Sequence, residues 1–117
     1  MTKEDITTAT RIFFSHRGVK LFKNEPHKKF ISGYWQVIKN LGYPKGSPDL
    51  MGWNVSNGVT HAVEIKTIND FLSKAQKLFI PIMINDNCVV YIASERTDGN
   101  IDLINYKTKE KEIIHVD

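Results

Sequence analysis

Three charged residues lie within a stretch that otherwise has the composition of buried β-strands. In "GSPDLMGWNVSNGVTHAVEIKT", residues 46–67, they are Asp49, Glu64 and Lys66. Two neighbouring carboxylates can hold a hard divalent cation such as Mg²⁺, which prefers one or two carboxylates together with waters and phosphate oxygens. Such a cation lowers the pKa of a bound water, while a lysine ammonium steadies developing negative charge. Brought together, these three side chains could hold a metal ion and support phosphodiester hydrolysis.

The sequence between the acids predicts a hairpin that brings the three side chains together. The Asn-Gly pair at 57–58 favours a two-residue turn, because both residues tolerate positive φ. That turn would place Met51 opposite Glu64 and Asp49 opposite Lys66. Directly opposed side chains point to the same face, so Asp49 would lie beside Lys66 and diagonal to Glu64. The alternative is an inert ladder of charges on an exposed sheet face.

The apolar residues before this hairpin predict one helix and two strands. The helix is expected at about 2–16, with Gly18 closing its C-terminus. Residues 19–24 alternate as a strand, residues 25–33 are typical of a basic loop, and residues 34–40 predict a short strand. The apolar face of the helix is assigned to Ile6, Ala9, Ile12 and Phe13.

A second helix and two further strands are predicted after the hairpin. The helix lies within residues 71–86, takes Ser73 as its N-cap, and should kink or end early near Pro81. Strands are expected at 88–94 and 101–107. This order predicts an α/β fold in which helices flank a mixed β-sheet. A length of 117 residues with 41% hydrophobic content suits a single domain that spans the chain.

The charges are distributed unevenly along the chain. Residues 1–48 hold 9 Lys and Arg against 3 Asp and Glu, whereas residues 49–117 hold 7 against 10. A basic half is expected for a nucleic-acid partner, although a solvated lysine-rich face gives the same composition. The residues assigned to DNA contacts are Lys20, Lys23, Lys28, Lys29, Lys45 and Ser47.

Several other classes of protein are disfavoured. No apolar run approaches the ~20 residues of a membrane span, and the start "MTKEDITT" lacks a signal-peptide pattern, so we expect a cytoplasmic protein without a membrane partner. No cluster of Cys and His has zinc spacing. No glycine-rich loop followed by Lys-Ser or Lys-Thr indicates an NTPase.

The residues of the predicted hairpin also resemble a known nuclease motif. Pro48-Asp49 and Glu64-Ile65-Lys66 resemble the PD-(D/E)xK pattern. The wider strings "KGSPDLMGW", "AVEIKT" and "LSKAQKLF" resemble the virus-type replication-repair nuclease domain, VRR-NUC, in its small stand-alone phage form. The resemblance spans most of the chain, and it implies a restriction-endonuclease-like core that acts in a bacterial host cell if the protein is phage-encoded.

The resemblance assigns roles to the residues of the hairpin. It implies that Asp49 and Glu64 hold Mg²⁺ or Mn²⁺ with help from the backbone carbonyl of Ile65. Lys66 would be the catalytic lysine. These expected ligands are all oxygens, which is the donor type that these hard cations prefer.

Two residues outside the hairpin also match the family. Glu4 would complete the acidic cluster, because family members begin with a helix that bears a glutamate. Gln76 matches a helix glutamine beside the active site. Both have a structural alternative, since an acid in a first helical turn suits the helix dipole, and Ser73 with Gln76 forms a capping box.

Together these features predict a divalent-metal-dependent, structure-specific DNA endonuclease. Small relatives in the family resemble Holliday junction resolvases, so we expect a homodimer that cuts branched DNA at two symmetry-related strands. The alternatives are a monomeric flap or nick-directed nuclease and a catalytically silent DNA-binding module. Apolar residues beyond the needs of one core would form the dimer contact: Tyr34, Trp35, Val37, Ile38, Phe79, Ile82 and Met83.

Overall fold

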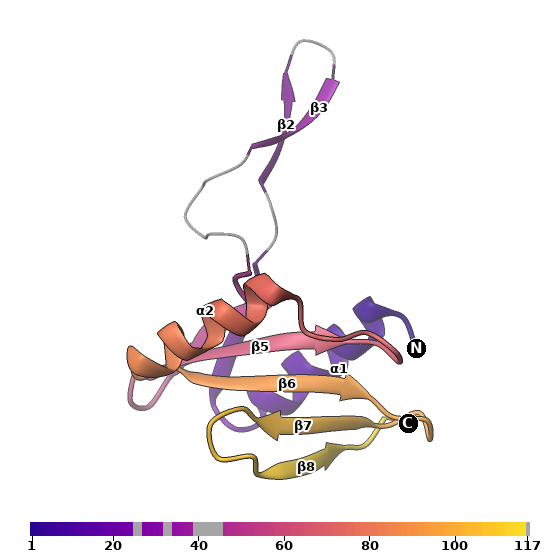
Figure 1. Ribbon diagram of the computed structural model, residues 1–117, viewed down its shortest axis with the longest axis vertical. Coiled ribbons are helices and arrows are strands. Elements are labelled where there is room, and N and C mark those ends of the chain that lie inside the picture. Colours follow the sequence, from indigo (N-terminus) through magenta and orange to yellow (C-terminus); the bar gives the residue numbers. More distant parts are fainter. Residues whose placement is uncertain (25–26, 32–33, 39–45, 117) are drawn as a thin grey trace.

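The computed structural model describes residues 1–24, 27–31, 34–38 and 46–116, and two helices lie on opposite faces of its main sheet (Figure 1). Six strands form this sheet in the order β1-β4-β5-β6-β7-β8, and β2 and β3 form a separate two-stranded sheet. β5 and β6 run parallel and the other neighbours antiparallel, so the predicted mixed sheet is confirmed. In chain order the elements are α1 (Lys3–Ser15), β1 (Val19–Lys23), β2 (His27–Ile31), β3 (Tyr34–Ile38), β4 (Leu50–Asn54), β5 (Thr60–Lys66), α2 (Lys74–Asn85), β6 (Val89–Glu95), β7 (Ile101–Asn105) and β8 (Lys111–Ile114).

The first helix forms where it was predicted, and three of the four residues assigned to its apolar face contact the core: Ile6, Ala9 and Phe13. Thr2 is its N-cap, and Ile6, Thr10 and Phe14 are buried at intervals of four residues. Thr10 can be buried because its hydroxyl donates to the carbonyl of Ile6 at 2.7 Å. Ile12 was assigned to the core face, yet it is 54% exposed. The buried stripe of Ile6, Thr10 and Phe14 excludes Ile12, because the ring of Phe14 is larger and removes more apolar surface from water.

Strand β5 separates two packed layers. Its Val63 and Ile65 belong to the cluster that α1 covers, whereas Ala62 packs with Ile80 and Met83 of α2. Because side chains alternate along a strand, the even-numbered residues of β5 all lie on the α2 face. Figure 1 shows α2 lying across this face, on the connection between β5 and β6. The acid and the lysine of β5 therefore share the α2 face.

A kink or an early end of the second helix was expected near Pro81; the early end was wrong, and the kink stays a prediction. The helix continues to Asn85, with Pro81 inside it. Pro81 removes one helical hydrogen bond, but Ile80 and Met83 are buried on either side of it and hold both halves of α2 against the sheet. In the part of the chain that the structure describes, neither helix has the length and apolarity needed to cross a membrane.

The loop between β4 and β5 is wider than the predicted two-residue turn. Asn54 N–H donates to the carbonyl of Val59 at 3.0 Å, so the loop contains four residues. Gly58 has a φ of +73°, but Asn57 is not among the residues with positive φ, whereas the two-residue turn needs both. The Asn57 side chain instead accepts from Val59 N–H, and the Asn54 side chain from Ser56 N–H. These side-chain bonds favour the wider loop.

The wider loop changes the strand register by two residues. Met51 faces Ala62 and Leu50 faces Val63, whereas Met51 was expected to face Glu64. A shift by an even number of residues leaves each side chain on its expected face. Continued by one pair, the observed register puts Asp49 directly opposite Glu64, in the place expected for Lys66.

Residues 25–33 were expected to be a basic loop, and this expectation was wrong for five of them. His27–Ile31 forms β2 and pairs antiparallel with β3, with His27 opposite Ile38. Figure 1 shows this hairpin standing apart from the six-stranded sheet. A polar segment becomes a strand when a neighbour pairs with it, and the local sequence does not reveal that pairing.

Candidate active site

Two hydrogen bonds join Asp49 to β5, one to Glu64 and one to Ile65, where β4 begins and β5 approaches its end. Asp49 N–H donates to Glu64 Oε1 at 3.0 Å. In return, Ile65 N–H donates to Asp49 Oδ2 at 2.8 Å. Each carboxylate is therefore fixed by a backbone amide of the other strand. This arrangement leaves Asp49 Oδ1 and Glu64 Oε2 free of those amides.

Glu64 is a fully buried acid with one unsatisfied oxygen. Its exposed fraction is 0%, and within the described residues its Oε2 has no hydrogen-bond partner. Burial and the neighbouring charge of Asp49 raise the pKa of Glu64 to about 7, while the Asp49 amide and Lys66 oppose the rise. Such a group binds a proton or another cation readily near neutral pH.

Lys66 extends along the same face of β5 and is held by α2. It is 8% exposed, and its Nζ donates to Gln76 Oε1 at 2.9 Å. Gln76 Oε1 also accepts from Ser73 N–H at 2.8 Å, and Ser73 Oγ accepts from Gln76 N–H at 3.1 Å. Asp70 lies 3.9 Å from Lys66 Nζ. Gln76 therefore both completes the capping box and fixes the ammonium.

The beginning of α1 supplies two further charges at the edge of this site. Lys3 Nζ donates to Asp49 Oδ1 at 2.9 Å, a contact that the sequence did not predict. Glu4 accepts from Lys23 Nζ at 2.7 Å and 2.8 Å. In the described ranges, no group of three His, Cys, Asp or Glu side chains is placed to hold a metal, so Glu4 is not gathered with Asp49 and Glu64.

The segment before Asp49 is fixed by close packing and one side chain. Gly46 has a φ of +92°, and a Cβ there would lie 2.5 Å from the carbonyl oxygen of Ala75 in α2. Only glycine fits both conditions. Asn24 Nδ2 donates to Ser47 Oγ and to the carbonyl of Pro48, each at 2.9 Å. Asn24 thus positions the strand entrance, although the sequence did not single it out.

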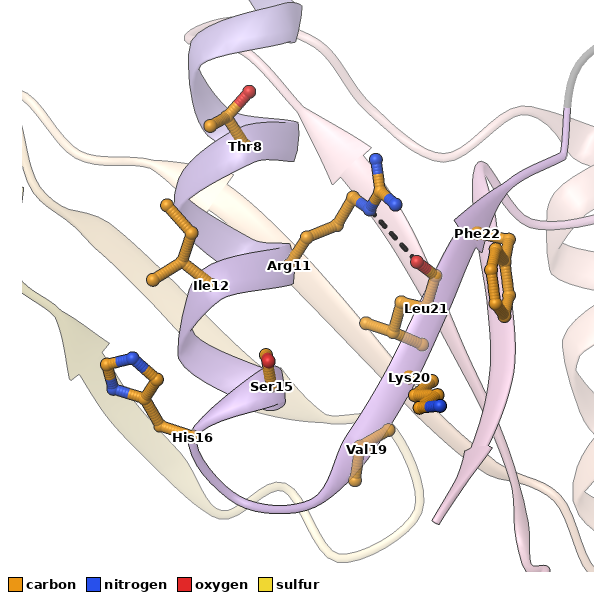
Figure 2. Close-up of a pocket in the computed structure, with 9 residues that line it drawn as sticks. All are labelled: Thr8, Arg11, Ile12, Ser15, His16, Val19, Lys20, Leu21 and Phe22. Carbon is orange, nitrogen blue, oxygen red and sulfur yellow. Dashed lines mark hydrogen bonds between the residues drawn. The ribbon is translucent and has the colours of Figure 1, made fainter. Parts of the chain in front are cut away.

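The residues assigned to DNA contacts are only partly described. Lys20 and Lys23 are exposed on β1, and Ser47 lies beside the site. Lys28 and Lys29 lie on β2, whose side chains are not described, and Lys45 lies outside the described residues. A groove of about 590 Å³ lies between α1 and β1. Arg11 Nε donates to the carbonyl of Leu21 there at 2.9 Å, a bond drawn in Figure 2. Three basic residues line this groove: Arg11, His16 and Lys20.

The oxygen atoms of this site fit a hard divalent cation. Glu64 Oε2 is a buried oxygen without a partner in the described parts of the chain, and the Asp49 carboxylate lies beside Glu64. The register continued by two pairs puts Ile65 opposite Pro48, which has no N–H to donate to the Ile65 carbonyl. Two carboxylates and a carbonyl are donors that Mg²⁺ accepts.

The model of one protein family matches this chain. The VRR-NUC domain model matches residues 5–96, which includes both acids, Lys66 and Gln76. The chain belongs to the VRR-NUC family. It is therefore a nuclease domain, and the predicted family is confirmed. No curated protein matches the sequence.

The VRR-NUC chain also resembles a solved structure. It superimposes on Hjc, a Holliday junction resolvase from the archaeal hyperthermophile Archaeoglobus fulgidus, with a TM-score of 0.54 at 11% sequence identity. The alignment covers 94% of this chain and 86% of Hjc. The likeness establishes the restriction-endonuclease-like fold, as predicted.

Proposed function

We propose that this VRR-NUC domain is a divalent-metal-dependent endonuclease that hydrolyses phosphodiester bonds in branched DNA. One observation carries the proposal: the fully buried Glu64 keeps an oxygen without a partner in the described residues, directly beside Asp49. A buried carboxylate next to a second one is unfavourable unless a cation is shared between them. A metal-dependent nuclease site would supply that cation, which explains why two carboxylates lie together here.

Each residue of the site would have its own role in phosphodiester cleavage. Asp49, Glu64 and the Ile65 carbonyl would hold Mg²⁺ or Mn²⁺, which when bound polarises a phosphate and lowers the pKa of a coordinated water. Lys66 would donate to the attacking water or to a phosphate oxygen as negative charge develops. Gln76 would position Lys66, because its Oε1 accepts from the ammonium at 2.9 Å.

The role of Glu4 belongs to the same proposal. Its carboxylate is held by Lys23 and lies on the first turn of α1, next to the Lys3 that contacts Asp49. We expect Glu4 to influence the site when Lys23 turns to a DNA phosphate. Lys20, Lys23, Lys28, Lys29, Lys45 and Ser47 would then contact the DNA backbone, which positions a substrate without reading its sequence.

The fold and an exposed apolar surface on α2 favour branched DNA as the substrate. The fold resembles that of Hjc, which is a Holliday junction resolvase. A four-way junction has two equivalent strands to cut, which suits a twofold-symmetric homodimer. Leu78 and Ile82 lie one turn apart on α2 and are 65% and 57% exposed, so they could form a self-complementary contact. Of the other residues expected in this contact, Met83 is buried beneath α2 and Phe79 packs against the same core cluster. The side chains of the remaining four lie outside the described part of the structure: Tyr34, Trp35, Val37 and Ile38.

A monomeric flap or nick-directed nuclease is the second candidate. The groove between α1 and β1, which Arg11 lines, favours it, since one strand or duplex arm could lie there without a second copy. A catalytically silent DNA-binding module is a third, but it would have no use for a buried and unsatisfied Glu64.

One panel of substrates tests the proposal. Labelled four-way junctions, flaps, single strands and blunt duplexes are incubated with Mg²⁺, Mn²⁺ or a chelator. We expect metal-dependent cuts in paired, symmetry-related strands of the junction. Cleavage of one strand of flaps with intact junctions would select the monomeric nuclease. No cleavage of any substrate with either metal would contradict the proposal.

A further inference from the structure

Two exposed aromatic rings lie together on β1 and β4. Phe22 is 49% exposed and Trp53 is 45% exposed, and their ring centroids are 5.5 Å apart with an angle of 31° between the planes. By contrast, the ring of Phe14 is buried and packs edge-on against Tyr91. Aromatic rings that touch each other but remain open to solvent are available to a binding partner.

These rings lie on the same face of the sheet as the acids. Phe22 is the cross-strand partner of Met51. Figure 2 shows Leu21 pointing toward α1 and Phe22 on the other side of β1. Because side chains alternate along β4, Trp53 and Met51 share the face of Asp49. Asp49 and Trp53 are four residues apart, roughly 13 Å along an extended chain.

The charges around the rings indicate what binds there. Lys20 is exposed and is the cross-strand partner of Trp53, so it shares the face of the rings. Aromatic rings with a cation beside them match a nucleotide, whose base stacks on a ring and whose phosphate pairs with an ammonium. A second copy of the chain is a poorer match, because it would bring Lys20 of one copy against Lys20 of the other.

Resting on the proposed nuclease function, we propose that Phe22 and Trp53 form a stacking site for an unpaired base of the DNA substrate. The base would lie on the strand that passes Asp49, a few nucleotides from the bond that is cut. Unpaired bases occur at branch points and flaps, whereas the bases of a blunt duplex are covered by their neighbours. The rings would therefore favour branched over continuous DNA.

The fluorescence of Trp53 tests this proposal directly. The chain has two tryptophans, so Trp35→Phe leaves Trp53 as the only one. This protein is titrated with a thymidine oligonucleotide and with a blunt duplex of equal length, in chelator so that nothing is cut. We expect the single strand to quench Trp53 and the duplex to leave it nearly unchanged. Equal quenching by both, or by neither, would overturn the proposal.

Substitutions provide a second and independent measurement. Phe22→Ala and Trp53→Ala should each weaken single-strand binding about tenfold by anisotropy of labelled DNA, with duplex binding changed less than twofold. Trp53→Phe should restore most of the loss, because a phenyl ring also stacks. Ile113→Ala, which trims an exposed apolar residue on β8, is the control and should change neither.

The outcomes separate this proposal from the proposed function. If Trp53 responds to single strands but no DNA is cut with metal, the stacking site stands and the nuclease function fails. If DNA is cut while single-strand binding is unchanged in Phe22→Ala and Trp53→Ala, the stacking site is wrong. A uniform loss of binding to single strand and duplex would also contradict it, since stacking acts only on unpaired bases.

Discussion

Glu64 is the residue on which the proposed chemistry depends most. Its carboxylate is fully buried, and the charge of Asp49 and the loss of water raise its pKa to about 7. Near neutral pH the metal-free protein therefore holds a substantial fraction of Glu64 in the protonated form. A metal ion must displace that proton, so metal binding should strengthen as the pH rises toward and above 7.

The first prediction concerns the stability of the metal-free protein. The unfolded chain binds the Glu64 proton with an ordinary pKa of 4.5, and the folded chain binds it more tightly. From pH 4.5 to 7 the folded state thus holds more protons, so this group lowers the free energy of unfolding as the pH rises, by roughly 3 kcal/mol at most. Denaturant titrations in chelator at several pH values measure this change.

The matched variant for that measurement is Glu64→Gln, which cannot ionise. Its stability should lack this decrease and should exceed that of the unmodified chain at pH 8. Parallel curves for the two proteins would show that Glu64 titrates like a solvated carboxylate, contrary to its burial.

Lys3 gives a second prediction at this scale. Its Nζ donates to Asp49 Oδ1 at 2.9 Å, so it competes with a divalent cation for that oxygen. Lys3→Met should tighten Mg²⁺ or Mn²⁺ binding two- to fivefold, about the worth of one exposed ion pair. Isothermal titration calorimetry measures the affinity. Lys111→Met, which removes a lysine 3.5 Å from Asp102, is the control and should leave it unchanged. Equal affinities for all three proteins would refute the competition.

The β4–β5 hairpin shows how much of the site its sequence could predict. Convergence of the acids and Lys66 on one face was predicted from strand alternation together with the turn at Asn57-Gly58, and it survived a register error because the shift was an even two residues. The position of Asp49 directly opposite Glu64 was not predicted from the sequence. It depends on whether Asn57 adopts a positive φ, and its side-chain bond to Val59 N–H decides that locally.

Contacts between distant elements were beyond sequence reasoning. Lys3 meets Asp49 only because α1 packs across the sheet and begins near the start of β4. Asn24 reaches Ser47, which lies 23 positions later in the sequence. By contrast, the link between Ser73 and Gln76 is local, so a capping box could be predicted there.

The β2–β3 hairpin gives the prediction at the scale of elements. Lys28 and Lys29 are assigned to phosphate contacts, and neutralising both to Gln should weaken binding to every DNA alike. The slope of log K against log salt concentration should become shallower by about 0.9 for each lost contact on duplex arms. The double variant Lys107→Gln and Lys109→Gln makes the same charge change after β7 and is the control. A slope that stays the same would place Lys28 and Lys29 on a merely solvated surface.

The assembly is predicted at the scale of the whole molecule. If two copies resolve a junction, light scattering at micromolar concentration should give a mass near twice 13.4 kDa. Ile82→Lys should return the mass to that of one chain, because it places a charge on the exposed ridge that Leu78 and Ile82 form on α2. Ile12→Lys makes the same change on α1 and should leave the dimer intact. A monomer that cuts junctions in paired strands would contradict this assembly.

The fold could be predicted from the sequence more fully than the preferred DNA substrate. Alternation along the strands and two helical patterns predicted the α/β sheet, and the family model and the likeness to Hjc confirm it. The preferred DNA depends on surfaces that the motif does not encode, such as Phe22 with Trp53 and the ridge of Leu78 with Ile82. A single domain that spans all 117 residues stays a prediction.

The central claim is that Asp49, Glu64 and Lys66 form a metal-dependent phosphodiesterase site. The most direct test measures single-turnover cleavage of one labelled junction or flap in Mg²⁺ by the unmodified chain and by Asp49→Asn, Glu64→Gln and Lys66→Ala. DNA binding is measured in parallel in chelator. We predict that all three variants lose cleavage by at least about a hundredfold and still bind DNA, and that Lys66→Ala still binds metal. Cleavage by Asp49→Asn or Glu64→Gln at the unmodified rate would contradict the account.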